Sequence, residues 1–180
     1  MTNLVELRTE RLLLRPYTNA DIPALLPLIG AREVAAMTLR VPHPYTEEDA
    51  RAMLQRFSHE TMKWFGIFLR AGEELCGGIG LNLEPDHDRA EIGYWIGIPY
   101  WGKGIASEAA REVIRYGFEE LKLHRIFAIC FAGNQASLRI LEKLGMTYEG
   151  RSRQHIKKWK EYRDVENYGM LAEEWKVECR

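Results

Sequence analysis

A glycine-rich stretch in the middle of the chain carries the clearest chemical signal. Residues 99–106 read Pro-Tyr-Trp-Gly-Lys-Gly-Ile-Ala and stand between an apolar run and a long amphipathic helix pattern. A loop that joins a strand to a helix directs several backbone N–H groups, and the positive end of the helix dipole, to one point. Such a point binds phosphate. A strand-to-helix turn without a ligand stays the alternative for this loop taken alone.

Two common phosphate-binding loops do not fit this stretch. The P-loop pattern Gly-x-x-x-x-Gly-Lys-Ser/Thr does not occur in the sequence. The dinucleotide fingerprint needs a third glycine and a place in the first βαβ unit, whereas this loop lies in mid-chain. A phosphate bound at this loop would therefore belong to a ligand other than those of the P-loop and dinucleotide-binding proteins.

The patterns around the loop predict one mixed α/β domain over residues 1–180. After the loop, apolar residues step by three and four from Ala106 to Leu121, which is typical of an amphipathic helix. Residues 125–131 form a continuous apolar run, as expected for a strand covered on both faces. Further strands are expected at 7–15, 63–70, 74–83, 91–98, 146–156 and 162–171, and further helices after Asp21, Thr46 and Asn134.

Composition excludes several classes of protein. The net charge of −1 gives no field that would attract nucleic acid or acidic membranes, and no apolar run is long enough to span a bilayer. The first ten residues lack the apolar core of a signal peptide. Cys76, Cys130 and Cys179 are widely spaced and odd in number, and the histidines show no metal-ligand spacing. We expect a cytoplasmic protein with reduced thiols, no metal, no direct nucleic-acid role and no membrane role.

Four segments, in order, resemble the GNAT acetyltransferases. Residues 134–146 resemble their "Asn-x-x-Ser … Leu-Glu-Lys-Leu-Gly-Phe" segment, and residues 101–106 resemble their acetyl-CoA loop, Gln/Arg-x-x-Gly-x-Gly/Ala. Residues 9–16 and 90–96 resemble the ribosomal-protein N-acetyltransferase (RimJ/RimL-like) branch. Trp101 stands where many members have Gln or Arg, so we expect backbone amides rather than this side chain to bind phosphate.

The resemblance implies a fold and a cosubstrate. The GNAT fold is an α/β (α+β) arrangement whose mixed, mostly antiparallel sheet splays apart at its centre, with about four flanking helices. Acetyl-CoA lies in that gap, its pantetheine paired with the backbone of the strand that ends at Ile98 and its pyrophosphate on the N–H groups of residues 102–106. The acetyl-CoA contacts expected here are Ile96, Ile98, Trp101, Gly102, Lys103, Gly104, Ile105, Ala106, Asn134 and Ser137.

Acetyl transfer to an amine needs a neutral amine and a departing thiolate. At pH 7 about a tenth of peptide α-amines are neutral, against far less than 1% of lysine side chains, so a base is useful for the former and close to essential for the latter. The resemblance implies Glu91 as this base, acting through water; His155, a bound water, or an ion-paired Glu91 without a catalytic role are the alternatives. Ser137 is the implied acid toward sulfur, against a serine that only satisfies backbone at a helix start.

A basic segment lies near the C-terminal end. Arg151, Arg153, His155 and Lys157 alternate, so a regular strand would place all four on one face. They could dock an acidic or phosphate-rich partner, but acidic residues nearby favour a solvated hairpin.

Together these observations predict an acetyl-CoA-dependent N-acetyltransferase that transfers directly to an amine, with a protein N-terminal α-amine as first choice. A small amine such as a polyamine or an amino-sugar antibiotic stays open as the acceptor. A non-catalytic acyl-CoA-binding module and a nucleotide-binding regulator are the competing classes. A homodimer is also left open.

Overall fold

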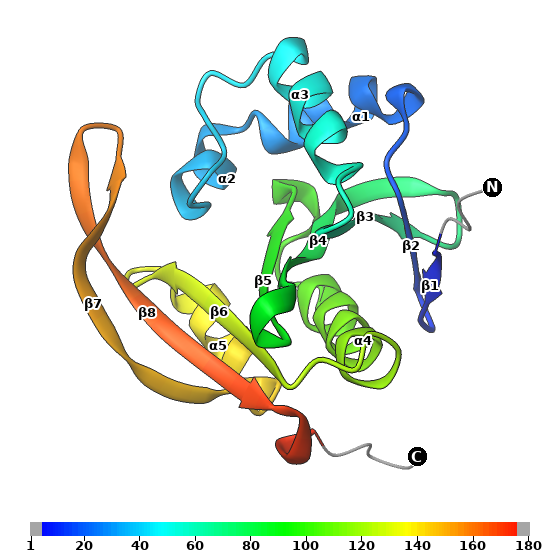
Figure 1. The fold of residues 1–180 in the computed structure, drawn as a ribbon. Coiled ribbons are helices and arrows are strands. Elements are labelled where there is room, and N and C mark those ends of the chain that lie inside the picture. The colour runs from blue at the N-terminus through cyan, green and yellow to red at the C-terminus, as the bar shows by residue number, and fades with distance from the viewer. Residues whose placement is uncertain (1–4, 176–180) are drawn as a thin grey trace.

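The sheet that carries the glycine-rich loop has eight strands. The computed structural model describes residues 5–175. The strand order is β1-β2-β3-β4-β5-β6-β8-β7, and every neighbouring pair is antiparallel except β5 and β6, which run parallel (Figure 1). The strands are β1 (Leu7–Arg8), β2 (Leu12–Arg15), β3 (Met62–Leu69), β4 (Glu74–Glu84), β5 (Arg89–Ile96), β6 (Arg125–Phe131), β7 (Thr147–Lys158) and β8 (Glu161–Leu171).

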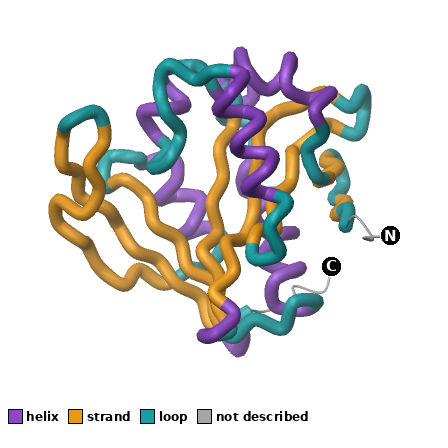
Figure 2. The backbone as a smooth tube through the Cα atoms, turned by 45° about the horizontal axis from the view of Figure 1, so that its top comes forward, coloured by secondary structure: helices purple, strands orange, loops and turns teal. Residues whose placement is uncertain are grey.

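Helices cover both faces of this sheet (Figure 2). They are α1 (Ile22–Ile29), α2 (Arg32–Met37), α3 (Glu47–Phe57), α4 (Ile105–Glu119) and α5 (Gln135–Lys143). The first three share one buried cluster with β3–β5, and α4 and α5 share a second cluster with the opposite face. The side chains of β5 alternate between these two clusters, since successive residues of a strand point to opposite faces.

The predicted amphipathic helix is α4, and its apolar stripe packs on the sheet. Ala110, Val113 and Ile114 are fully buried. At Gly117 an added Cβ would lie 2.7 Å from Cδ1 of Ile126, so the helix contacts β6 directly there. Close packing along this stripe fixes where α4 begins, and therefore where the glycine-rich loop lies.

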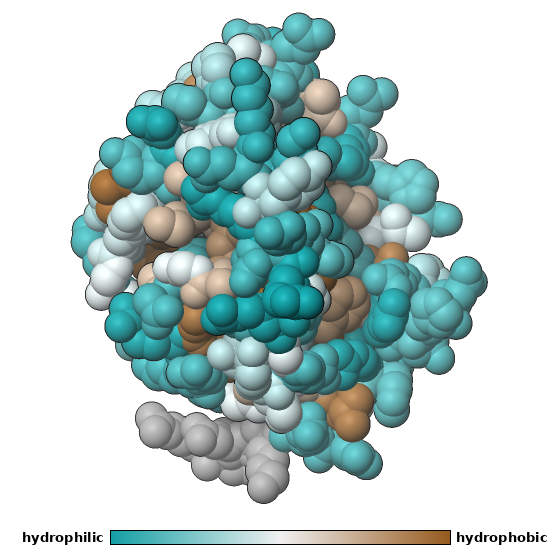
Figure 3. Space-filling view, turned by 90° about the vertical axis from the view of Figure 1, so that its left-hand side faces the viewer, coloured by the Kyte–Doolittle hydropathy of each residue, from teal (hydrophilic) through white to brown (hydrophobic). Residues whose placement is uncertain are grey.

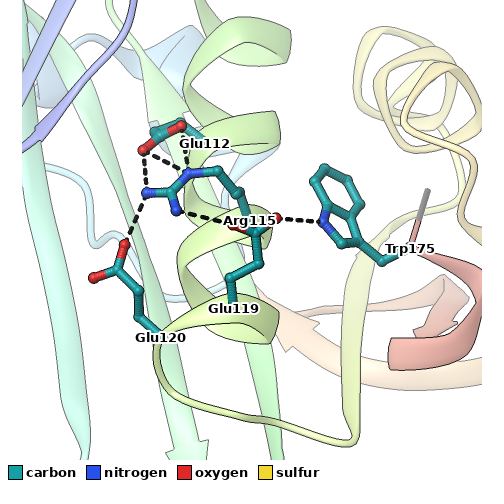
Figure 4. A network of polar contacts seen from close by, with 5 residues as sticks. All are labelled: Glu112, Arg115, Glu119, Glu120 and Trp175. Carbon is teal, nitrogen blue, oxygen red and sulfur yellow. Dashed lines mark hydrogen bonds and ion pairs between the residues drawn. The ribbon is translucent and has the colours of Figure 1, made fainter. Parts of the chain in front are cut away.

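The last turn of α4 also holds the final described residues of the chain. Arg115 pairs with Glu112 (2.7 Å), Glu119 (3.2 Å) and Glu120 (2.8 Å), as Figure 4 shows. Nε1 of Trp175 donates to Glu119 at 3.2 Å, and its ring lies against Phe118 in the same region. The partly exposed ion pairs of Arg115 add modest stability within the end of α4, and the contacts of Trp175 join the C-terminal 3-10 turn to this helix.

Three details differ from the sequence-based predictions. The strand expected at 7–15 is two strands, because Thr9 turns the chain and accepts the N–H of Leu12 on its hydroxyl. Helix α2 was not predicted, since its six residues are too few to show a helical period, and it raises the flanking helices to five among the described residues. Finally, β5 ends at Ile96 rather than Ile98, because a 3-10 turn (Ile98–Tyr100) containing Pro99 begins there.

The basic segment of β7 is not the regular strand on which the expectation of one shared basic face depends. Residues 153–155 oppose the single residue Asp164, so the pairing shifts between Ser152 and Ile156 and the alternation is interrupted. In addition, Arg151 forms an ion pair with Glu166 at 2.5 Å. The interrupted strand and the paired guanidinium favour a solvated hairpin over a continuous basic docking face.

The cysteines that the structure describes are buried and unpaired. Burial raises the pKa of both Cys76 and Cys130 to about 11, so neither thiol is reactive at neutral pH. Cys179 lies outside the described residues. Within residues 5–175 no cluster of His, Cys, Asp and Glu has the geometry to hold a metal ion, and no helix is both long and apolar enough to cross a membrane.

Candidate active site

The sheet opens between its two parallel strands. β5 and β6 are paired only over three residues, from Arg89 opposite Arg125 to Glu91 opposite Phe127. Beyond that point β5 stays on β4 and β6 stays on β8, so the two strands diverge (Figure 1). The backbone groups of β5 that face β6 are therefore left without a strand partner after Glu91.

A cavity of about 1080 Å³ follows this opening through the sheet. Its α4–α5 side is lined by the starts of α4 and α5 and by Tyr94 and Ile96 of β5. Its α2–α3 side is lined by residues 37–42, parts of α3, and Trp64, Glu91 and Trp95. Because Glu91 and Trp95 point to the opposite face of β5 from Tyr94 and Ile96, one cavity gives access to both faces of this strand.

The glycine-rich loop ends at the α4–α5 side of the cavity. Gly102 and Gly104 have φ angles of +73° and +76°, in the left-handed region that glycine adopts without strain. The first helical bond of α4 runs from the N–H of Glu108 to the carbonyl of Gly104, so the N–H groups of residues 104–107 have no partner inside the helix. All four of these residues line the cavity. The start of this 15-residue helix therefore offers an anion several unpaired donors.

Two of the residues predicted to contact acetyl-CoA lie outside the cavity lining. Lys103 does not line the cavity; its Nζ lies 5.5 Å from the centre of the Tyr100 ring. Ile98 is in the 3-10 turn, 41% exposed, and also outside the cavity lining. Ile105 and Ala106, by contrast, are at the cavity wall as expected.

The backbone of β5 presents polar groups to the opening. The N–H of Gly97 donates to Cys76 on β4 at 2.8 Å, and a peptide's C=O points opposite to its N–H, so the C=O of Ile96 faces away from β4. Nε1 of Trp101 donates to this oxygen at 2.7 Å, which leaves its second lone pair free. Tyr94 lies two residues earlier and points its backbone the same way. The strand thus presents the backbone groups of Tyr94 and Ile96 to the opening, and the acetyl-CoA contact at Ile98 stays a prediction.

Glu91 is at the point where the strands separate. It is only 8% exposed, and its two carboxylate oxygens accept from Nη2 (2.8 Å) and Nη1 (3.3 Å) of Arg40. Arg40 belongs to the segment between α2 and α3, 51 residues away in the sequence. His155, the alternative base, is exposed on β7 and does not line the cavity.

Ser137 faces the same cavity from the first turn of α5. Asn134 caps this helix, its Oδ1 accepting the N–H of Ser137 at 3.1 Å, as the sequence predicts. The hydroxyl groups of Ser137 and Tyr94 are 2.7 Å apart. Burial raises the pKa of the Tyr94 hydroxyl above its usual range, and the bond to Ser137 offsets part of that shift. The serine hydroxyl is therefore held beside a proton-bearing phenol in the opening.

Sequence reasoning did not identify two of these partners. Neither Tyr94 nor Arg40 is among the site residues that the sequence predicts. The two-residue period of β5 could have placed Tyr94 on the same face as Ile96. Nothing local to Arg40 indicates its partner.

Comparison with known proteins identifies the class to which this arrangement belongs. A family model described as "Acetyltransferase (GNAT) domain" matches residues 11–147. The chain is 34% identical over 171 residues to the "Uncharacterized N-acetyltransferase YnaD" of Bacillus subtilis, covering 95% of this chain and 99% of that protein. The crystal structure of a GNAT-family acetyltransferase from Bacillus anthracis has a TM-score of 0.85 and 33% identity, covering 94% of this chain and 99% of that one.

The chain belongs to the GNAT family of acetyltransferases, whose members use acetyl-CoA. Its fold is the GNAT fold. A further relative is the "Putative ribosomal N-acetyltransferase YdaF" of Bacillus subtilis, 43% identical over 106 residues, which are 58% of this chain and 57% of that protein. The resemblance to ribosomal-protein N-acetyltransferases is thereby confirmed, and the protein is an N-acetyltransferase.

Proposed function

We propose that this N-acetyltransferase transfers acetyl directly from acetyl-CoA to a single amine, and that the amine is the α-amine of a protein N-terminus. One observation carries the proposal. The cavity joins the two faces of β5, with the helix-start donors and Ser137 on the α4–α5 side and the Glu91 carboxylate on the α2–α3 side. A thioester and an amine entering from opposite sides would meet in the opening, without a covalent enzyme intermediate.

Each step of the transfer has a candidate residue. The acceptor ammonium gives a proton to Glu91, directly or through water, and the neutral nitrogen attacks the thioester carbonyl carbon. As the C–S bond breaks, the thiolate takes a proton from the hydroxyl of Ser137 and the nitrogen gives up its second proton. That second proton restores the serine hydroxyl, either through water or through Tyr94, whose hydroxyl lies 2.7 Å from it.

The charges on the α2–α3 side support an acceptor with one amine. Arg40 and Arg56 both line this side, whereas its two carboxylates already accept hydrogen bonds. Glu91 accepts from Arg40, and Asp49 accepts from the backbone and hydroxyl of Thr46. A polyamine or an amino-sugar antibiotic carries several ammonium groups and needs several free carboxylates. These surroundings suit a peptide α-amine better.

A screen of amines tests the proposal. Release of the CoA thiol would be followed with peptides that have a free N-terminus, with N-terminally blocked peptides that contain lysine, and with spermidine and an aminoglycoside. We expect the free α-amine to give a kcat/KM at least about tenfold above the blocked peptide, because far more of it is neutral at pH 7. A preference for spermidine or the aminoglycoside would contradict the assignment.

A further inference from the structure

Lys158, at the end of β7, is buried in an unusual setting. The residue is 6% exposed, and its Nζ donates to the carbonyls of Thr38 (3.0 Å) and Val41 (2.5 Å). Among residues 5–175 it forms no ion pair with a carboxylate. Burial, with a smaller effect from the charge of Arg163, lowers the pKa of Lys158. Burying an ammonium group without a counter-charge is costly, and its two bonds to backbone carbonyls offset part of that cost.

The two carbonyls belong to one short segment, residues 37–41, which forms a wall of the cavity. Arg40 lies between Thr38 and Val41 and reaches Glu91 from there. At the start of the segment, the carbonyl of Met37 accepts from Nδ2 of Asn134 at 3.3 Å. The segment is thus held from β7, from the cap of α5 and from β5.

The turn between β7 and β8 makes further contacts around this segment. The ring of Trp159 lies 6.0 Å from that of His43 and 5.7 Å from the guanidinium of Arg32, which stand on either side of residues 37–41. Seen from the side of α2 and this hairpin, the surface is mainly hydrophilic, with apolar patches between polar side chains (Figure 3). Met37 and Trp159 are among the exposed apolar residues, at 48% and 38%.

We propose that Lys158 is a positioning residue for the acceptor site. It does not line the cavity, and it acts through residues 37–41 by setting where Arg40 meets Glu91. Residues 37–41 form the cavity wall beside Glu91, and the two bonds from Arg40 hold that carboxylate in place. The position of this segment therefore sets the shape of the acceptor site at Glu91. This inference rests on the proposed role of Glu91 toward the acceptor.

The kinetic test compares Lys158→Met with the neighbouring Lys157→Met. Methionine keeps the length of the side chain but removes the donors, whereas Lys157 is exposed on the hairpin with its Nζ near the Tyr162 ring. We expect Lys158→Met to raise the acceptor KM about tenfold and to leave the Kd of CoA within about twofold of the parent value. Lys158→Arg should have an acceptor KM close to the parent value. Lys157→Met should match the parent in both the acceptor KM and the Kd of CoA. An unchanged acceptor KM, or an equal loss of CoA affinity, would overturn the inference.

A second readout does not depend on turnover. Cleavage by trypsin after Arg40, followed by mass spectrometry, should be slow in the parent, faster in Lys158→Met and unchanged in Lys157→Met, because a protease cuts this segment only when it opens locally. If no amine is acetylated, the proposed function fails while this measurement still reports on Lys158. Cleavage in the parent as fast as in an unstructured peptide would overturn the role of Lys158, whether or not the methionine variant folds.

Discussion

The two sides of the cavity are built in different ways. The α4–α5 side presents main-chain groups at the start of α4, residues 104–107, and of β5, together with the start of α5. The α2–α3 side depends on side chains from distant parts of the chain, with separations of 51 residues for Arg40 and Glu91 and 120 for Lys158 and Thr38. A main-chain site can be encoded by a short motif, whereas the second side changes whenever one of several loops changes. The difference explains why the cosubstrate follows from the sequence but the acceptor does not.

The strongest test of the α4–α5 side is Gly104→Glu. Its φ of +76° disfavours any side chain, and a carboxylate at this position would repel a phosphate bound at the start of α4. We expect CoA affinity to fall at least about 100-fold, measured by calorimetry, with circular dichroism unchanged. Gly72→Glu is the matched control: it also has a positive φ, of +151°, but its surroundings are open and it is outside the cavity lining. Equal CoA affinity in the two variants would contradict the phosphate site.

The strongest test of the α2–α3 side is Glu91→Gln. Glutamine keeps the size of the side chain but cannot accept a proton from the acceptor. We expect kcat/KM for the acceptor to fall about 100-fold, and its rise with pH to flatten, while CoA binding stays as in the parent. His155→Gln serves as the control, since His155 is exposed outside the cavity. A parent-like pH profile for Glu91→Gln would place the base elsewhere.

Ser137→Ala tests the proposed proton donor to sulfur on the α4–α5 side. Without the hydroxyl the departing thiolate loses its proton donor, so we expect kcat to fall about tenfold or more with CoA affinity nearly unchanged. Tyr94→Phe should give a smaller loss, because Ser137 keeps its own proton and loses only its partner at 2.7 Å. A larger loss in Tyr94→Phe than in Ser137→Ala would make the tyrosine the acid.

Glu108→Gln should have the smallest effect, on stability. Glu108 accepts from the side chain of Thr9 (2.5 Å) and from the backbone (3.0 Å) and side chain (2.7 Å) of Arg11, whose guanidinium also donates to the carbonyl of Lys103. Burial alone would raise the pKa of Glu108, but these bonds outweigh it and hold the pKa below the ordinary 4.5. The carboxylate therefore stabilises the fold above about pH 4.5, and this contribution is lost as the pH falls through the lowered value.

We expect Glu108→Gln to lower the free energy of unfolding by about 1–2 kcal/mol at pH 7, and to lose that difference in acid. Urea titrations at pH 7 and pH 3 measure both quantities. A difference that does not shrink between pH 7 and pH 3 would mean that the carboxylate charge is not the cause.

The periodic and motif-bearing parts of the chain could be predicted well. Strand β6 has the predicted bounds, the stripe of α4 is buried as expected, and Thr46 and Asn134 cap their helices as predicted. These features depend on interactions within a few residues of the chain. The sequence also placed Ser137 and the donors of the glycine-rich loop at the cavity.

Features that depend on tertiary contacts could not be predicted. Arg40 lies in an irregular segment with no pattern that indicates Glu91, and Lys158 reads as one of several basic residues in a hairpin. The interruption of β7 arises where Gln154 takes a φ of +50° and its N–H donates to Asp164 at 2.8 Å. Such a bulge leaves no mark on the alternating pattern of basic residues.

Backbone hydrogen exchange with and without CoA tests the central claim most directly, namely that main-chain groups of the open sheet and of the α4 start bind the cosubstrate. We expect CoA to slow exchange of the amides in residues 92–97 and 102–107, and to leave residues 37–46 much less affected. No protection in the first two stretches at saturating CoA, or protection confined to residues 37–46, would contradict the account.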